Sequence, residues 1–101
     1  MSLSTHVLDA AAGRPAAGMA VRLDRRDGAG WTTVTSAHTD DDGRITGWST
    51  REGVYRLVFD TDRPGTFYPE VAVTFRVTDP GEHHHVPLLL SPFAYSTYRG
   101  S

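Results

Sequence analysis

The sequence contains no cysteine and no lysine, so its ten cationic side chains are all arginine. Without thiols the chain can form no disulfide, thiolate metal site or cysteine nucleophile, and without lysine it can form no Schiff base. The arginines are scattered and the net charge is only -2, which argues against nucleic acid or a membrane surface as a partner. Histidine, carboxylate, hydroxyl and arginine chemistry remain.

The length of 101 residues predicts a single domain over residues 1–101. A chain of this size removes roughly 60 to 70% of its unfolded surface from water, and no length is left for a second core. The first residues enter a strand-like pattern without the basic and apolar regions of a signal peptide. We therefore expect a cytoplasmic protein.

Short stretches of alternating apolar and polar residues dominate the chain, and no convincing helical periodicity occurs. Strands are expected at 5–10, 19–24, 31–38, 44–48, 54–59, 71–77 and 83–90. About eight short strands at this spacing predict an all-β, two-sheet β-sandwich. The segment 60–66 contains Pro64-Gly65 and is expected to hold at most one short helical turn. Pro87 predicts an edge strand or a bulge, because proline cannot donate to a strand ladder.

The predicted strand at 83–90 carries three consecutive histidines. Side chains alternate between the two faces of a strand, so Val86, Leu88 and Leu90 share their apolar face with His84. His83 and His85 then point together to the other face. Two neutral imidazoles close together are candidate acid/base groups near physiological pH, whereas His84 belongs toward the core and is not expected to be catalytic.

Four segments together resemble the transthyretin-related 5-hydroxyisourate hydrolases. They are Leu-Ser-Thr-His-Val-Leu-Asp at 3–9, Gly-Arg-Pro-Ala-Ala-Gly-Met at 13–19, Thr-Asp-Asp-Asp-Gly-Arg at 39–44, and His-His-His-Val-Pro-Leu-Leu-Leu-Ser-Pro at 83–92 with the terminal Tyr-Ser-Thr-Tyr-Arg-Gly-Ser at 95–101. The likeness spans nearly the whole chain. Two features depart from the family: His84 replaces its usual tyrosine, and 60–66 is brief where members carry a short helix.

The resemblance implies a transthyretin-like sandwich that opens the ring of 5-hydroxyisourate in urate degradation, without a cofactor. It implies a homotetramer with its sites at the dimer-dimer interface. Either His6 or His85 would be the general base, the other histidine would orient groups or relay a proton, and Arg44 would bind substrate and stabilise the oxyanion. The substrate-binding residues implied are His6, Arg44, His83, Tyr98, Arg99, Gly100 and Ser101.

Each of these residues also has a structural interpretation. A strand histidine such as His6 can simply bond a neighbouring carbonyl, and Arg44 can be a surface charge at a turn end. Tyr98 and Arg99 can anchor the tail. His83 and His85 can form a solvated polar face, and no function is predicted for His38.

A metal site is one alternative to metal-free acid/base catalysis. Converging imidazoles of His6, His83 and His85 would resemble a catalytic zinc site with an open water position. The acidic run at 40–42 lacks the spacing and the flanking helices of an EF-hand. At the level of function, the alternatives are a small-ligand binding module without catalysis and a purely structural sandwich.

Overall fold

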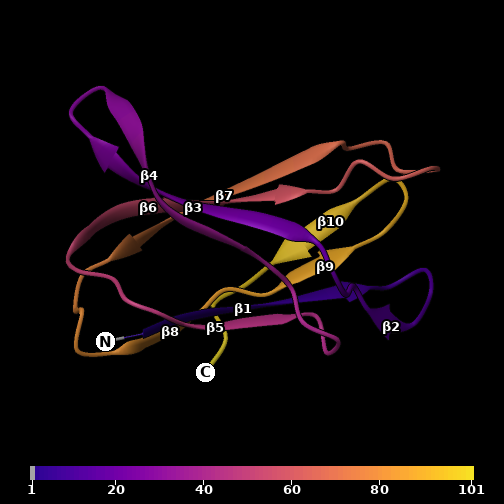
Figure 1. Cartoon of the computed structure of the whole chain (residues 1–101), viewed down its shortest axis with the longest axis horizontal. Helices are drawn as coiled ribbons and strands as arrows, with labels where there is room; N and C mark the ends of the chain where they lie inside the picture. The colour runs from indigo at the N-terminus through magenta and orange to yellow at the C-terminus, as the bar shows by residue number, and fades with distance from the viewer. Residues whose placement is uncertain (1) are drawn as a thin grey trace.

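The computed structural model describes residues 2–101 and builds them into ten β-strands, with no helix in that range. The strands are β1 (Ser2–Asp9), β2 (Arg14–Pro15), β3 (Ala20–Asp27), β4 (Gly30–His38), β5 (Arg44–Trp48), β6 (Gly53–Asp60), β7 (Glu70–Val77), β8 (His83–His85), β9 (Leu88–Leu90) and β10 (Tyr95–Thr97). They form two sheets stacked as a sandwich (Figure 1). The predicted all-β, two-sheet architecture is confirmed. Within residues 2–101 no helix exists that could cross a membrane.

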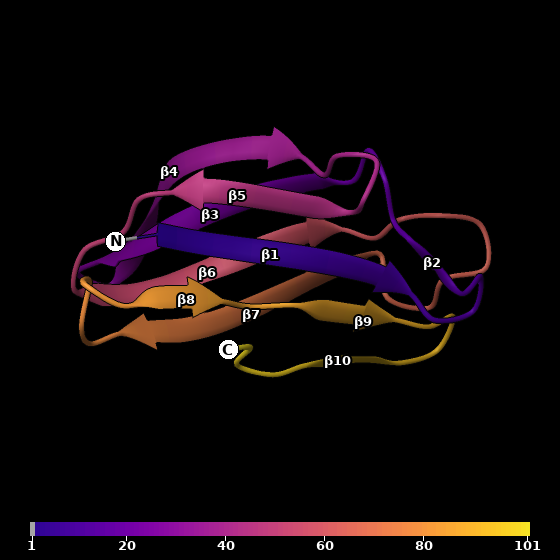
Figure 2. The same ribbon diagram turned by 90° about the horizontal axis from the view of Figure 1, so that it is seen from below.

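One sheet is organised around β1. Its order is β10-β9-β1-β2, and β5 and β8 also pair with β1. The strand β1 runs parallel to β8 and then to β9, and antiparallel to β5 and β2 (Figure 2). Since β1 receives partners along both of its sides, it brings residues from distant parts of the chain together.

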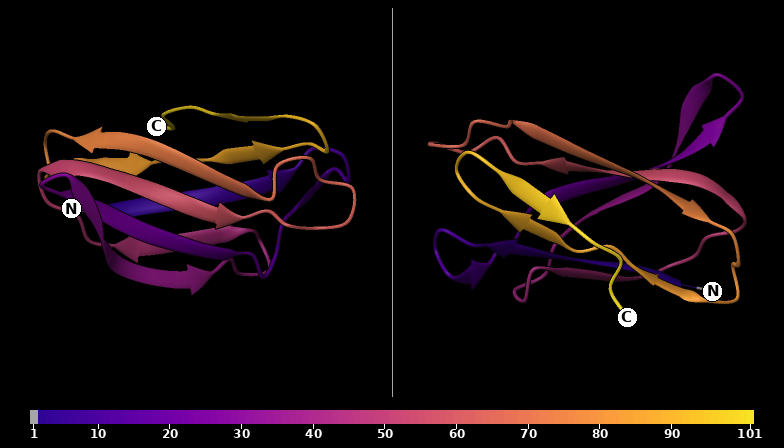
Figure 3. Two further views of the ribbon diagram at one scale, coloured as in Figure 1. Left: turned by 90° about the horizontal axis from the view of Figure 1, so that it is seen from above. Right: turned by 180° about the vertical axis from the view of Figure 1, so that it is seen from behind.

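The second sheet has the order β4-β3-β6-β7 and is antiparallel throughout. It covers the inner face of the first sheet (Figure 3). Alternate residues of both sheets point into the space between them. The fully buried members of this core include Leu3, Val7, Leu23, Leu57, Phe59, Val71 and Leu88. Burial of each such side chain contributes on the order of 1.5–3 kcal/mol relative to exposure, and it fixes which face of each strand is left for solvent.

The prediction that Pro87 lies in an edge strand or a bulge is wrong. Pro87 lies between β8 and β9, and this stretch is interior because β1 flanks one side while β10 and Gly100 flank the other. No residue is inserted either, since the pairing advances from Ser4↔His85 to Val7↔Leu88, three residues on each strand. The proline interrupts the ladder because it has no N–H, and it thereby divides one expected strand into two.

The segment 61–69 between β6 and β7 contains no helix, in agreement with the sequence. A turn closes it, with the N–H of Thr66 donating to the carbonyl of Arg63 at 3.1 Å. The ten strands exceed the seven expected ranges because the range 83–90 is divided at Pro87 and because β2 and β10 are additional short strands. These differences leave the arrangement of the two layers unchanged.

Candidate active site

The outer face of the β1 sheet carries the predicted histidines. In β1 the odd-numbered Leu3 and Val7 are fully buried in the core, so Ser4 and His6 face outward. In β8, His84 is buried, while His83 is exposed and His85 is half-buried on the outer face. The face predicted for each of the three consecutive histidines is therefore confirmed.

Arg44 begins β5 and lies directly across from His6 in the antiparallel β1–β5 pair. Directly opposite side chains in such a pair share a face, with Cβ atoms about 4.5–5.5 Å apart. Within the part of the chain that the structure describes, the Arg44 guanidinium forms no ion pair with a carboxylate. Its planar donors therefore remain free for a ligand with carbonyl or anionic oxygens.

The turn before β5 positions Arg44. The Asp40 carboxylate accepts hydrogen bonds from the N–H groups of Asp42 and Arg44, both at 2.9 Å. Gly43 has a φ of +77° and donates its N–H to the Asp40 carbonyl. Its own carbonyl accepts from Val7 N–H at 2.8 Å, which attaches the turn to β1. Of the acidic residues 40–42, Asp40 therefore stabilises the turn through its carboxylate.

His6 is oriented by the same turn. Its Nε2 lies 2.9 Å from the carbonyl oxygen of Asp42. A carbonyl only accepts hydrogen bonds, so Nε2 carries the proton in this arrangement and Nδ1 of neutral His6 bears the lone pair. The backbone of the acidic turn thus selects one tautomer of His6.

Two serines of β1 hold the paired histidines of β8. Ser4 Oγ lies 2.7 Å from His85 Nδ1 and 3.0 Å from His83 Nε2. Ser2 Oγ lies 2.6 Å from His83 Nδ1. The two imidazoles are nearly parallel, with an angle of 15° between their planes and 6.5 Å between their centres. Among residues 2–101, no side chain or backbone group bonds His85 Nε2.

The electrostatic environment keeps His85 neutral. Burial, the Arg44 cation and the nearby rings of His83 and His6 together hold the pKa of His85 below its usual value of 6.5. A hydrogen bond with the backbone of Ser4 opposes this shift and does not overcome it. A neutral imidazole keeps a lone pair at neutral pH, which is the state that a general base requires.

The C-terminal segment contributes Gly100 to this site but directs Tyr98 and Arg99 elsewhere. Gly100 N–H donates to the carbonyl of His85 at 2.8 Å, and Ser101 follows it with its side chain exposed. Tyr98 and Arg99 line a cavity of about 240 Å³ beside the core-facing His84. Arg99 also contacts Glu82 at 3.4 Å. One chain therefore does not place Tyr98 and Arg99 on the face that carries His6, Arg44 and His85.

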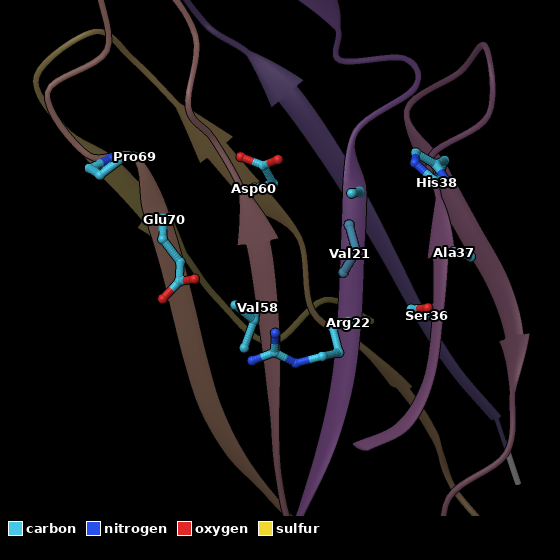
Figure 4. A pocket seen from close by; sticks show the side chains of 10 residues that line it. Val21, Arg22, Ser36, Ala37, His38, Val58, Asp60, Pro69 and Glu70 are labelled. Atoms are coloured by element: carbon cyan, nitrogen blue, oxygen red, sulfur yellow. The ribbon is translucent and has the colours of Figure 1, made fainter. Parts of the chain in front are cut away.

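Two histidines lie outside the cluster. His84 Nδ1 donates to the carbonyl of Glu82 at 3.1 Å, and the side chain is buried on the core side, away from the cluster. His38, together with Arg22 and Asp60, lines an open hollow of about 440 Å³ on the outer face of the other sheet (Figure 4). This hollow is larger than the cavity at the tail, but it contains none of the paired imidazoles.

The described residues 2–101 contain no group of three histidine and carboxylate side chains arranged to hold a metal ion. Hydrogen bonds also engage several of the ring nitrogens of His6 and His83. His6 Nε2 is directed to a backbone carbonyl, and both ring nitrogens of His83 bond serine hydroxyls.

Ser2, Ser4 and the orienting carbonyl of Asp42 were not among the predicted site residues. The i, i+2 spacing of Ser2, Ser4 and His6 could have marked three outward positions on one strand. Nothing local connects them to His83 and His85, which are about 80 residues away. Only the parallel pairing of β1 with β8 does so.

Known proteins are similar to this chain in both sequence and fold. A 5-hydroxyisourate hydrolase of Salmonella typhimurium is 45% identical over 109 residues, covering 98% of this chain and 80% of that protein. The structure of Klebsiella pneumoniae 5-hydroxyisourate hydrolase superposes with a TM-score of 0.85 at 34% identity, covering all of both chains. Sea bream transthyretin in complex with thyroxine gives a TM-score of 0.87 at 32% identity, covering 97% of this chain and 93% of that one.

A family model, described as the HIUase/Transthyretin family, matches residues 3–100. That span contains both sheets and the histidine face described above. The sequence resemblance and the two-sheet sandwich therefore lead to the same assignment: the chain belongs to the HIUase/Transthyretin family.

Proposed function

We propose that this protein hydrolyses 5-hydroxyisourate, the unstable product of urate oxidation, and opens its six-membered ring. The product is 2-oxo-4-hydroxy-4-carboxy-5-ureidoimidazoline, on the route from urate to allantoin. One observation carries the proposal: a chain of this family presents His6, Arg44 and His85 on a single sheet face, with a free guanidinium beside a neutral imidazole.

In the proposed reaction a water molecule attacks a ring carbonyl. A neutral histidine takes the proton from this water, and a positioned base of this kind contributes on the order of 10²- to 10⁴-fold in rate. Arg44 binds the oxygen-rich ring and stabilises the negative charge that develops on the attacked carbonyl. The ring C–N bond then breaks, and its nitrogen receives a proton.

His85 is the general base in this proposal. Its lowered pKa keeps it neutral, and its Nε2 has no partner among the described residues. His6 is held by the Asp42 carbonyl with Nδ1 unprotonated, a state suited to receiving a hydrogen bond from substrate or water. We therefore assign His6 to orienting the substrate and the attacking water.

We further propose a homotetramer with the active sites at the dimer-dimer interface. Tyr98 and Arg99 are separated from Arg44 within one chain, so their substrate contacts would come from a neighbouring subunit. The strands β7 and β10 are among the edge strands of the two sheets and are paired along one side only in the described chain, and such edges can pair with another subunit. His83, Gly100 and Ser101 would complete the binding site near His85.

Light scattering on a sizing column, with activity measured across the elution, tests this assembly. A tetramer that carries all the activity is expected. A fully active monomer would show that one chain suffices and would reject the shared site.

The central experiment follows the ultraviolet decay of freshly generated 5-hydroxyisourate against its spontaneous rate. Wild-type protein should accelerate the decay, and His85→Ala should lower kcat/KM by about 10²- to 10⁴-fold. Arg44→Ala should lower it by about 10²- to 10³-fold, and His6→Ala should also impair it. Arg14→Ala, an exposed arginine on β2, is the matched control and should retain activity.

Folding and assembly of each variant are verified before its rate is interpreted. Chelator treatment of the wild-type protein addresses the zinc alternative: retained activity agrees with the proposed metal-free reaction, while lost activity that zinc restores would contradict it. No acceleration by folded, assembled wild-type protein would reject the hydrolase function.

A binding module without catalysis is the second candidate, because sea bream transthyretin shares this fold and its structure contains thyroxine. Tight binding of a small ligand without ring opening would favour it. Unchanged function in all three site variants would favour a purely structural sandwich. The expected cytoplasmic location is part of the first proposal and is tested by fractionation of the native cells.

A further inference from the structure

The hydroxyl of Ser4 lies between the two outward imidazoles of β8. It is 2.7 Å from His85 Nδ1 and 3.0 Å from His83 Nε2, and Ser2 Oγ is 2.6 Å from the remaining nitrogen, His83 Nδ1. Ser2, His83, Ser4 and His85 thus form one unbranched chain of hydrogen bonds. Its inner end is His85 beside Arg44, and its outer end is the partly exposed Ser2.

Strand pairing builds this chain of groups. The parallel register aligns Ser2 with His83 and Ser4 with His85. All four residues occupy alternate positions, so their side chains share one face. Ser4 is 6% exposed, and bulk water therefore has little access to its position between the rings.

Two neutral arrangements keep the Ser4 hydroxyl proton within this chain of hydrogen bonds. A neutral imidazole has one N–H and one lone pair, and a hydroxyl has one proton to donate. In the first arrangement His85 Nδ1–H donates to Ser4, the Ser4 hydroxyl donates to His83 Nε2, and His83 Nδ1–H donates to Ser2. His85 Nε2 then bears a lone pair. In the second arrangement every donor is reversed, and Nε2 bears a proton.

We propose that Ser4, His83 and Ser2 form a proton relay that conducts the proton taken up by His85 to solvent. This inference rests on the proposed hydrolase function. Ser4 and Ser2 act through His85 and are positioning residues, because neither needs to touch the substrate. The same relay couples the tautomer of His85 to that of His83.

Each group in the relay releases one proton as it receives another. The attacking water forms its bond to the ring carbonyl carbon and gives a proton to His85 Nε2, while Nδ1–H passes to Ser4. The Ser4 proton passes to His83 Nε2, the His83 Nδ1 proton passes to Ser2, and the Ser2 proton leaves to solvent. His85 now presents Nε2–H, which protonates the departing ring nitrogen, and a proton entering at Ser2 restores the first arrangement.

The relay explains how a base works in a site that opposes a charged imidazolium. Burial and the cationic Arg44 both disfavour protonated His85 and lower its pKa. Because Nδ1 releases a proton as Nε2 receives one, the imidazole remains neutral throughout. A histidine without Ser4 would have to carry the positive charge next to Arg44.

The test compares Ser4→Ala, which removes the hydroxyl, with Ser4→Thr, which retains it. We expect Ser4→Ala to lower kcat by roughly 10- to 100-fold, a part of the full contribution of a general base, with KM changed less than about twofold. Ser4→Thr should recover most of the rate. Ser36→Ala, an exposed serine on the other sheet, is the matched control and should match wild type.

Two further readouts separate a relay from a structural role. The dependence of kcat on the deuterium fraction of the solvent should be curved in wild type, since several protons move together, and linear in Ser4→Ala. Nitrogen-15 NMR of the histidine rings in ligand-free protein should show that Ser4→Ala changes the tautomer populations of both His83 and His85.

An unchanged kcat in Ser4→Ala, or an equal loss in Ser4→Thr, would overturn the relay while leaving the hydrolase function intact. No wild-type acceleration would instead reject the hydrolase function. In that case the NMR comparison still reports whether the hydroxyl couples the two rings, and unaltered ring nitrogens in Ser4→Ala would reject the relay on its own.

Discussion

Gly100 donates its N–H to the carbonyl oxygen of His85 at 2.8 Å, and its Cα faces the His85 ring. A Cβ built on Gly100 would collide with Cδ2 of that ring and lie 3.1 Å from its Cγ. Gly100 does not have a positive φ, so the backbone itself accepts alanine. Only the His85 imidazole excludes a side chain at position 100.

Gly100→Ala should therefore impair His85 with little effect on folding. We expect kcat/KM to fall by about 10- to 100-fold as the ring is displaced, since a base must stay within hydrogen-bond reach of its proton. The free energy of unfolding should change by less than about 1 kcal/mol. Gly30→Ala is the control, because a Cβ there approaches only one atom, at 4.0 Å. Equal rates for the two variants would contradict the prediction.

Arg44 is predicted to control the protonation of His85. Its cation is one cause of the lowered His85 pKa, after burial. Arg44→Gln should raise the pKa of His85 toward 6.5, so the neutral form is lost at a higher pH than in wild type. NMR titration of the His85 ring measures this shift without substrate. Arg14→Gln should leave the titration unchanged, and an unshifted midpoint in Arg44→Gln would refute the assignment.

Alanine substitutions at Gly43 and Gly47 distinguish the effect of backbone strain from that of a steric collision. Gly43 lies in the turn before β5, and Gly47 lies within β5. Their φ values are +77° and +79°, so alanine costs roughly 1–2 kcal/mol at either position. A Cβ at Gly43 would additionally lie 2.5 Å from the Val7 carbonyl oxygen, whereas one at Gly47 meets nothing within 4 Å.

Gly43→Ala should consequently be more destabilising than Gly47→Ala, by at least about 1 kcal/mol in denaturant unfolding. It should also reduce activity more, because the same turn orients His6 and Arg44. Similar unfolding free energies for the two variants would mean that the chain relaxes around the added methyl group.

Asp24 holds two arginines on the outer face of the other sheet. Its carboxylate is 2% exposed and accepts Nε–H of Arg22 at 2.9 Å and Nε–H of Arg56 at 2.8 Å. Burial acts to raise the pKa of Asp24, but the hydrogen bonds from Arg22, Arg56 and Thr33 outweigh it and lower the pKa. Asp24→Asn should lower the free energy of unfolding by about 2 kcal/mol. This is less than the loss expected when one partner of a fully buried ion pair is removed, because both arginines reach water.

The stability lost in Asp24→Asn should diminish as the pH falls. A lowered carboxylate pKa stabilises the fold above the unfolded value near 3.8, and this stabilisation is lost as the pH falls through the folded pKa. The stability difference between wild type and Asp24→Asn should therefore be constant near neutral pH and shrink in acid. Asp27→Asn, an exposed site at the end of β3, serves as control. A difference that persists unchanged in acid would contradict this account.

Much of the fold was predictable because strand patterns are local. The alternation of Val71, Val73, Phe75 and Val77 predicted a strand within one residue of β7. The neighbourhood of Pro87 was not predictable, because the lack of an N–H shows that one ladder bond is missing but does not show whether a neighbouring strand still covers the position. The pairing on both sides of that stretch depends on residues far away in the sequence.

The sequence by itself determined which side chains face away from the core. His83 and His85 must point together, opposite to His84, because successive strand residues alternate whatever their neighbours are. Only the tertiary structure decided what those side chains meet. Parallel pairing with β1 places Ser4 between the two rings, and antiparallel pairing with β5 places Arg44 across from His6. The direction in which a side chain points is a property of the local backbone, whereas the register between strands is set by the packing of the whole sandwich.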